Sequence, residues 1–453
     1  MKKRMMTGIG MAMMMVLLAG CGTVADSDRD ARLNELESER AVNATTAEPE
    51  SEQKEKKPIE IIEDAFDMSQ GAIPKVYIEQ SAGIDEISRE EYIPVTIRIV
   101  DETGQYADIE TSDGKIKVGG HSSASGKKKP YNIKFASKTN VLGMGESKKW
   151  NLIANLYDPT QLRNKIVFEF ARNIGMEYTS NTQFVEVYLN GEYKGLYLMT
   201  EPVEEGKDKV DIDVEKNEYL LELQPNSENS EDVTFLTYRG TYLSIKDGKD
   251  DNLTYIKNLI NNFEYSFEKG YEEMSRYADL DTFVDYYVLS ELFKDVDFAT
   301  TSAYYYVKDG MIYAGPIWDY DLSMGNAGDY YPAYNSEGTY EDSAEGFYCQ
   351  KYWFYFLTQN EEFMMRVKKR FEEMQPLIDN LTTDNELGKN RIDSLTMTYG
   401  TYLSKNAQLW NVGTEYSLTG MQRLPDGTYK ENVDYLRNWI IKRNEWLKSQ
   451  WCE

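Results

Sequence analysis

Alternation of apolar and polar residues between about residues 76 and 245 constrains the fold of this chain most. Five runs alternate and are rich in β-branched and aromatic side chains, as strands are: residues 92–100, 115–118, 131–135, 184–189 and 219–223. Asn190-Gly191 stands between two alternating runs and indicates a tight hairpin. The pattern therefore predicts an antiparallel-rich sheet in this half of the chain.

One helix is predicted inside the sheet-rich half. Asp158 is its expected N-cap, with Pro159 at the first helical position, Gln161 three residues after the cap and Gly175 just past the end. Its apolar residues recur every four positions, at Leu162, Ile166, Phe170 and Ile174. Glu169 lies beside that apolar stripe rather than on the solvent side.

Longer helical patterns begin at about residue 252. They cover residues near 252–269, 279–294, 360–378, 387–411 and 430–450, and are broken by a strand pair at 303–307 and 311–314. The sequence predicts an α+β fold in which residues 71–250 are sheet-rich and residues 251–453 are helix-rich.

The first twenty residues predict export. Lys2, Lys3 and Arg4 precede an apolar run that closes with Leu18-Ala19-Gly20-Cys21. This resembles a bacterial lipoprotein signal, so we expect cleavage before Cys21, lipidation of its thiol and tethering at the extracytoplasmic face of the cell membrane. An uncleaved anchor is the alternative, but the apolar run is shorter than the ~20 residues that span a bilayer. Residues 21–70 are acidic and poor in large apolar side chains, and are predicted to be a disordered spacer.

Charge and composition exclude several classes of function. The net charge of −27 argues against a nucleic-acid partner and favours, at most, a basic protein partner. His121 is the only histidine, which argues against histidine-dependent triads and histidine-rich zinc sites. Apart from Cys21, only Cys349 and Cys452 are present, and they could form a disulfide or remain thiols.

The segment Pro316-Ile317-Trp318-Asp319-Tyr320-Asp321 carries the strongest chemical signal. If it is the end of a strand, Asp319 and Asp321 project from one face, roughly 6–7 Å apart. That spacing suits one or two hard cations such as Mg²⁺ held against a phosphate. A surface turn with two solvated acids is the alternative.

Three further features suggest phosphate chemistry. Alternation places Lys134 on a strand, where it could meet Glu169 of the following helix, as a lysine and a glutamate meet in protein kinases. Residues 119–126 form a small-residue loop able to bring backbone N–H groups to phosphate oxygens, although a plain hairpin loop is an equal account. Asp297 follows a predicted helix and could face the acid pair to accept a hydroxyl proton.

Several blocks in consistent order resemble the CotH family of atypical, spore-coat-type protein kinases. They are Lys129-Pro130-Tyr131-Asn132-Ile133-Lys134-Phe135, Lys149-Trp150-Asn151-Leu152, Tyr157-Asp158-Pro159 with Leu162-Arg163-Asn164, residues 186–201, and the two-aspartate segment. The resemblance covers roughly residues 90–330.

The resemblance implies a divergent protein-kinase-like fold over residues 71–453. It also implies transfer of phosphate from ATP, with Mg²⁺ or Mn²⁺, to serine or threonine of secreted or surface proteins. Among these, the acidity of the chain favours basic and serine-rich proteins. By the same resemblance, ATP would be bound by Lys134, with Glu169 as its partner, and by the loop residues Ser122 and Ser123. Asp297 would be catalytic, and Asp319 with Asp321 would hold the metal.

Two other hypotheses are kept. This chain has Gly119-Gly120-His121-Ser122-Ser123 where the family usually shows an Arg-Gly-Asn-Ser type of loop, which is consistent with a non-catalytic, kinase-like surface-binding lipoprotein. The 35 tyrosines would suit sugar stacking in a glycan hydrolase built on paired acids, which would need no nucleotide.

Overall fold

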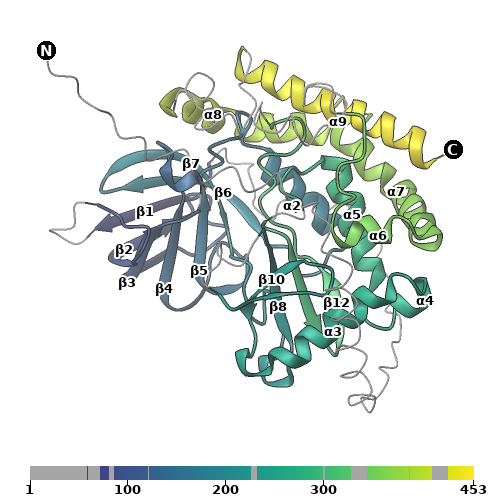
Figure 1. Ribbon diagram of the computed structural model, residues 1–453. Coiled ribbons are helices and arrows are strands. Elements are labelled where there is room, and N and C mark those ends of the chain that lie inside the picture. The colour runs from purple at the N-terminus through teal and green to yellow at the C-terminus, as the bar shows by residue number, and fades with distance from the viewer. Residues whose placement is uncertain are drawn as a thin grey trace, which may run out of the picture. The chain divides into compact units, whose positions relative to one another are not determined.

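The computed structural model describes Ile59 and residues 72–80, 86–120, 122–225, 232–298, 301–327, 344–386, 388–410 and 427–452 (Figure 1). All of them belong to one compact unit, Gln53–Glu453. The predicted signal, Cys21 and, apart from Ile59, the predicted spacer lie outside the described residues, as does His121.

Seven strands of the N-terminal half close into a barrel. The strands are β1 (Lys75–Gln80), β2 (Ile93–Val100), β3 (Ile109–Val118), β4 (Tyr131–Asn140), β5 (Glu146–Ile153), β6 (Thr182–Leu189) and β7 (Glu192–Thr200), in the order β1-β2-β3-β4-β5-β7-β6. Neighbours pair antiparallel except β1 and β6, whose parallel pairing closes the barrel. The predicted strands and the Asn190-Gly191 hairpin are confirmed, whereas the closure was not predicted.

A second sheet joins the two halves of the chain. Its strands are β8 (Tyr219–Gln224), β9 (Thr234–Leu236), β10 (Tyr242–Asp247), β11 (Tyr304–Lys308) and β12 (Met311–Ala314), in the order β12-β11-β8-β10-β9. The predicted hairpin of the helix-rich half is therefore β11–β12, and it pairs through β11 with β8.

Helices make up most of the described C-terminal part. After α2 (Arg163–Asn173) come α3 (Leu253–Ser266), α4 (Tyr271–Met274), α5 (Leu280–Phe293), α6 (Trp353–Leu357), α7 (Glu361–Thr382), α8 (Arg391–Trp410) and α9 (Tyr429–Trp451). Short 3-10 turns lie at η1 (Ser122–Ser125), η2 (Val214–Lys216) and η3 (Asp250–Asn252). Helices α7, α8 and α9 pack against one another, and α5 packs against α7 and α9 (Figure 1). The predicted α+β class, with a sheet-rich first half and a helix-rich second half, is confirmed.

Helix α2 begins later than its cap signals predicted. It starts at Arg163, and the carboxylate of Asp158 accepts hydrogen bonds from the backbone N–H groups of Thr160 (2.8 Å) and Arg163 (2.8 Å) instead of capping a helix at 159. Pro159 and Gln161, whose φ is 60°, therefore lie in a turn before the helix. The predicted end is confirmed, because Gly175 follows the C-cap at φ 81°.

One apolar core runs through both halves. The four-residue stripe of α2 is at most 2 % exposed, and nearly every side chain of α5 is buried, so α5 is a central helix rather than an amphipathic surface helix. Cys349 is buried, Cys452 is exposed, and the two thiols are not joined. None of the helices in the described ranges is long and apolar enough to cross a membrane.

Candidate active site

Asp319 and Asp321 lie in the segment that follows β12, not in the strand. β12 ends at Ala314, the chain turns at Gly315 (φ 115°), and Asp319 has a φ of 64°. The predicted strand end is therefore wrong, and the alternation argument for one shared face does not apply. A non-glycine residue at positive φ is costly, and such residues gather at functional sites.

Arg163 at the start of α2 fixes the backbone just after the two aspartates. Its Nε donates to the carbonyl oxygen of Ser323 (3.0 Å) and its Nη2 to that of Met324 (3.2 Å). Its Nη1 forms an ion pair with Asp158 in which both side chains are almost fully buried. The ion pair and the two carbonyl bonds hold one end of the two-aspartate segment rigidly against the helix.

Two asparagines complete this attachment. The Oδ1 of Asn164 accepts from the backbone N–H of Tyr320 (2.8 Å), between the two aspartates. The Nδ2 of Asn326 donates to the carbonyl oxygens of Asp321 (2.7 Å) and Tyr157 (2.8 Å). The backbone around both carboxylates is therefore fixed by side chains from α2, from the turn before it and from the segment itself.

Asp297 leaves the central helix as predicted. Helix α5 ends at Phe293, Lys294 follows in the left-handed region, and the Oδ1 of Asp295 accepts from the backbone N–H of Asp297 (3.3 Å). Asp297 thus stands on a short turn anchored to a buried helix.

The structure brings Asp297 together with Asp319 and Asp321. Burial raises the pKa of Asp297 to about 7, the charge of Asp319 adds to the rise, and Lys351 opposes it. Burial raises the pKa of Asp319 to about 6. Burial, then the charges of Asp319 and Asp297, raise the pKa of Asp321 well above its ordinary value. This is the behaviour of carboxylates that share a confined site and repel one another.

Asp295 belongs to the same group of acids. Burial raises its pKa well above the ordinary value, and the charge of Asp297 adds to the rise. Paired acids with strongly shifted pKa values mark functional sites more often than ordinary surfaces.

Lys351 supplies positive charge beside these acids. Its Nζ lies 3.4 Å from the ring centroid of Tyr348, whose hydroxyl donates to the carbonyl oxygen of Val296 (2.8 Å), between Asp295 and Asp297. Burial lowers the pKa of Lys351 to about 8, although the neighbouring acids oppose the shift.

A fully buried ion pair fixes the segment that carries Lys351. Glu291 of α5 pairs with Arg443 of α9 (2.7 Å), and neither side chain is exposed. The same Glu291 carboxylate accepts from the backbone N–H groups of Tyr348 (3.0 Å) and Cys349 (2.7 Å). Three segments distant in sequence are thereby locked around the acids.

The small-residue loop lies between β3 and β4, as predicted, and contains η1. Gly120 has a φ of 73°, and an added Cβ there would lie 2.2 Å from the Oγ of Ser123, so the turn requires glycine. Lys129 Nζ donates to the carbonyl oxygen of Ala124 (2.6 Å) and holds the loop from its far end. The buried Lys128 Nζ donates to the carbonyl oxygens of Ala154 (2.8 Å) and Leu196.

Lys134 and Glu169 do not form the expected pair. Lys134 lies on β4 directly opposite Lys115 and Lys149, and no ion pair joins it to Glu169 in the described structure. The Lys134 Nζ lies 5.9 Å from the ring centroid of Tyr92.

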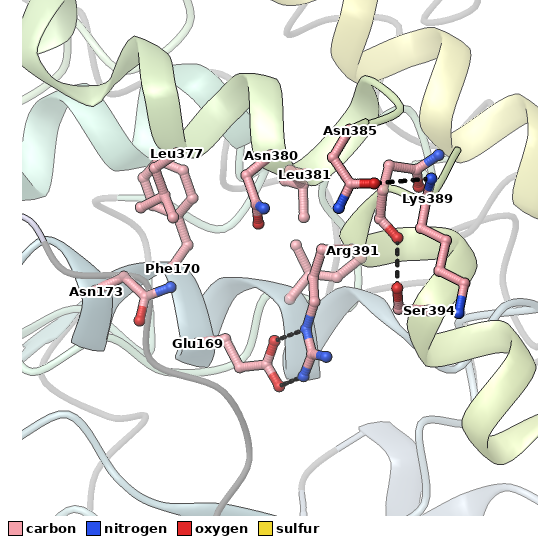
Figure 2. A pocket seen from close by; sticks show the side chains of 12 residues that line it. Glu169, Phe170, Asn173, Leu377, Asn380, Leu381, Asn385, Lys389, Arg391 and Ser394 are labelled. Atoms are coloured by element: carbon pink, nitrogen blue, oxygen red, sulfur yellow. Dashed lines mark hydrogen bonds and ion pairs between the residues drawn. The ribbon is translucent and has the colours of Figure 1, made fainter. Parts of the chain in front are cut away.

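Glu169 pairs instead with Arg391 at the start of α8. Two hydrogen bonds of 2.8 and 3.0 Å join its carboxylate to the guanidinium (Figure 2), and Lys165 lies 3.4 Å away on the same helix. Glu169 and Arg391 line a polar pocket between α2, α7 and α8, and no other predicted site residue lines it. The expected partner was wrong because a distant helix supplies a closer and better-shaped cation.

Sequence reasoning missed the contributions of Asp158, Asp295 and Lys351. Asp158 was predicted as a cap and lies in one of the family blocks, but no part in the acidic site was predicted for it; its charge also raises the pKa of Asp321. Asp295 stands two residues before Asp297, so its spacing was a usable signal. No sequence pattern pointed to Lys351, because it comes close to Asp297 only in the folded chain.

The acids do not form a complete protein cage for a metal. No three Asp, Glu, His or Cys side chains within the described ranges have the spacing of a metal site. Mg²⁺ does not require one, because proteins commonly bind it through one or two carboxylates and leave the other positions to water and substrate phosphates. The donor set, which consists of crowded and mutually repelling oxygens, is chemically suited to such a cation.

Comparison with known families identifies the family. The sequence model described as CotH kinase protein matches residues 116–447, most of the chain, so the chain belongs to the CotH kinase family. The expected resemblance is confirmed, and the match extends beyond the residues that suggested it. No curated protein matches the sequence. Membership supports kinase-type chemistry, with use of ATP and a divalent metal in general terms.

Proposed function

We propose that the protein is an exported, membrane-anchored kinase that transfers phosphate from ATP to serine or threonine of a secreted or surface protein. The observation that carries the proposal is the group of three carboxylates, Asp297, Asp319 and Asp321, whose charges act on one another in a member of a kinase family. Phosphoryl transfer is catalysed mainly by positioning and by charge compensation, and a fixed acidic site with a nearby lysine suits both.

Asp319 and Asp321 are the proposed ligands of Mg²⁺ or Mn²⁺. When bound, the metal would neutralise charge on the nucleotide phosphates. The three anchors Arg163, Asn164 and Asn326 would keep the two carboxylates in place, so that little reorganisation is needed when the ligand arrives.

Asp297 is the proposed acceptor of the hydroxyl proton. A group acting as base near neutral pH needs a pKa close to that pH, and burial raises the pKa of Asp297 to about 7. Lys351 would stabilise the ionised form of Asp297 and offer charge to the phosphoryl group.

The loop with Ser122 and Ser123 is proposed to cover the nucleotide phosphates. Lys134 on β4 is proposed to contact the same phosphates. Glu169 is assigned a different task from the one expected, because its carboxylate is occupied by Arg391 and Lys165. It would hold α2 to α8 and so support Arg163 and Asn164 on the same helix.

A divergent kinase-like arrangement is part of the proposal. The barrel with its loop would act as the smaller lobe and the helical part as the larger one, with residues 71–453 as the kinase domain. For location, we propose lipidation of Cys21 after removal of residues 1–20, with residues 21–70 as a spacer at the extracytoplasmic face. We propose no nucleic-acid partner.

A kinase-like module that binds a surface partner without catalysis is the second candidate. The observation that favours it is the Gly-Gly-His-Ser-Ser sequence at 119–123, which lacks the arginine and asparagine of the usual family loop. The two candidates differ in one outcome, because only the kinase requires Asp297.

The test is transfer of labelled γ-phosphate from ATP to serine-containing protein acceptors by the full chain, with and without Mg²⁺ or Mn²⁺. We expect metal-dependent transfer that Asp297→Asn and Asp319→Asn each reduce by at least a hundredfold. Asp309→Asn is the matched control, because Asp309 is also an aspartate at positive φ (51°) but lies exposed in the β11–β12 turn. Equal transfer by all variants would overturn the site, and none by the wild type would favour the binding module.

A further inference from the structure

Lysines form an uninterrupted row across three neighbouring strands of the barrel. In the strand register, Lys115 of β3 lies directly opposite Lys134 of β4, which lies directly opposite Lys149 of β5. Residues opposite each other in antiparallel strands share a face, so the three side chains project on the same side about 5 Å apart from strand to strand. Lys117, two residues along β3, belongs to the same face.

Tyr92 organises two of these lysines. The Nζ of Lys117 lies 5.1 Å and that of Lys134 5.9 Å from the centroid of the Tyr92 ring. We call Tyr92, Lys115, Lys117 and Lys149 the lysine face; Lys134, which lies between them, keeps its proposed contact with the nucleotide phosphates.

Acidic side chains do little to neutralise the lysine face. Lys149 forms an ion pair with Glu204 (2.6 Å), but the same carboxylate also pairs with Lys209. Within the described ranges, no carboxylate pairs with Lys115, Lys117 or Lys134. Like charges placed directly opposite on neighbouring strands destabilise a sheet, so fold stability does not account for the row.

Within the described ranges, β3, β4 and β5 make their main packing contacts with neighbouring strands of the barrel rather than with helices. Lys115 is exposed, and Lys117, Lys134 and Lys149 are half-buried. Lysines commonly cover their aliphatic stems while the charged end stays in water.

The sign of this surface is opposite to that of the whole chain, whose net charge is −27. The negative net charge of the chain favours a basic acceptor, but the local charge of a docking surface determines which segment of the acceptor binds to it. An acidic segment would also have to overcome repulsion from the rest of the molecule, so a local basic face adds selectivity.

We propose that the lysine face is the docking surface for the acceptor protein, and that it takes an Asp/Glu-rich segment beside the serine or threonine to be phosphorylated. That the bound protein is the phosphate acceptor rests on the proposed function, whereas the binding of an acidic segment to this face does not. An extended segment with several carboxylates within about 10 Å would meet Lys115, Lys117 and Lys149, given the spacing of strands. The loop that contains η1 comes after β3 in the chain, so a segment bound along β3 toward its C-terminal end would approach the proposed phosphate cover.

Binding of labelled peptides to the full chain tests the proposal. One peptide carries a serine flanked by aspartates and glutamates, and the other carries the same serine flanked by lysines and arginines. We expect the acidic peptide to bind at least tenfold more tightly than the basic one, with affinity that falls as salt rises. Equal binding of both peptides, or preference for the basic one, would overturn the proposal.

The variant Lys115→Glu/Lys117→Glu removes two of the three lysines of the face and leaves Lys134 unchanged. It should weaken binding of the acidic peptide at least tenfold, leave the melting temperature shift with ATP and Mg²⁺ unchanged, and leave the unliganded protein at least as stable, because it removes like-charge repulsion. Lys138→Glu is the matched control on the exposed end of β4 and should change none of these.

The outcomes separate this inference from the proposed function. Binding of the acidic peptide without any effect of nucleotide would keep the docking surface and defeat the kinase. A nucleotide effect with unaltered peptide binding in the double variant would keep the kinase and defeat the docking surface. Loss of the nucleotide effect in the double variant would show that the face is part of the nucleotide site. Binding to anionic vesicles but not to the peptide would show that it is a membrane-binding surface. Each of these last two results would overturn the inference.

Discussion

The guanidinium of Arg163, at the start of α2, donates to the carbonyl oxygen of Ser323, two residues after Asp321 (3.0 Å). This bond, with its neighbour to Met324, ties a helix of the sheet-rich half to the acidic segment of the helix-rich half. This buried side chain therefore acts with Asn164 and Asn326 to hold the acidic segment against α2.

Arg163→Met should destabilise the protein by about 3–5 kcal/mol, because it leaves Asp158 buried without its partner. Chemical denaturation measures the change. Arg172→Met is the control on the same helix: Arg172 also donates to a carbonyl oxygen, that of Ser180, but from a partly exposed position, so about 1 kcal/mol is expected. Equal losses in the two variants would contradict a special role for Arg163.

The crowded acids predict that stability falls as pH rises. The pKa of Asp297 is about 7 in the folded protein and about 3.9 in an unfolded chain, so the folded state binds the proton more tightly. That stabilisation is complete below about pH 4 and is lost as pH approaches 7. In metal-free buffer, Asp297→Asn should therefore gain about 1–4 kcal/mol over the wild type between pH 4.5 and pH 8. A constant difference across this range would show that Asp297 has no raised pKa.

Lys351 should matter for turnover more than for nucleotide binding. Because its charge lowers the pKa of Asp297, Lys351→Met should reduce transfer at least tenfold and move the acidic limb of the pH–rate profile to higher pH. Lys351→Arg should restore part of the rate, and Lys369→Met, on the exposed side of α7, should change nothing. A lower rate with an unmoved pH profile would indicate only a structural role.

Glu169 and Arg391 should be energetically coupled, whereas Glu169 and Lys134 should not. Double-mutant cycles with alanine should give about 1–3 kcal/mol for the first pair, which is bidentate and largely buried, and close to zero for the second. Coupling to Lys134 of similar size would restore the pairing that the sequence suggested.

Much of the fold was predictable because it depends on local patterns. Alternation predicted β2, part of β3, β4, β6, β7, β8, β11 and β12, and helical patterns predicted α2, α3, α5, α7, α8 and α9. Strands β1, β5, β9 and β10 and the short helices α4 and α6 were not predicted. The closure of the barrel was not predictable, because it depends on the parallel pairing of β1 with β6, which are more than a hundred residues apart. The start of α2 was misassigned because Asp158 carries the signature of a cap while its carboxylate serves Thr160 and Arg163.

The residues of the candidate site were predictable in part, but the geometry that brings them together was not. Asp319 and Asp321 lie together, but through a left-handed backbone at Asp319 rather than through strand alternation. Lys134 lies on a strand as predicted, yet the partner of Glu169 comes from α8. No local pattern indicates which of several distant cations will pair with a given carboxylate. The segment that carries Lys351 is likewise held beside the acids by residues distant in sequence, among them the ion pair of Glu291 with Arg443.

The most direct test of the central claim is the thermal stability of the full chain with ATP and Mg²⁺ or Mn²⁺, compared with that of Asp321→Ala. A ligand that binds the folded state must raise its stability, so we predict a melting temperature increase that needs nucleotide and metal together. Asp321→Ala should raise the melting temperature of the unliganded protein, because one repelling charge is gone, and should abolish the shift. A wild type that no combination of nucleotide and metal stabilises, or a variant that keeps the full shift, would contradict a nucleotide site at these acids.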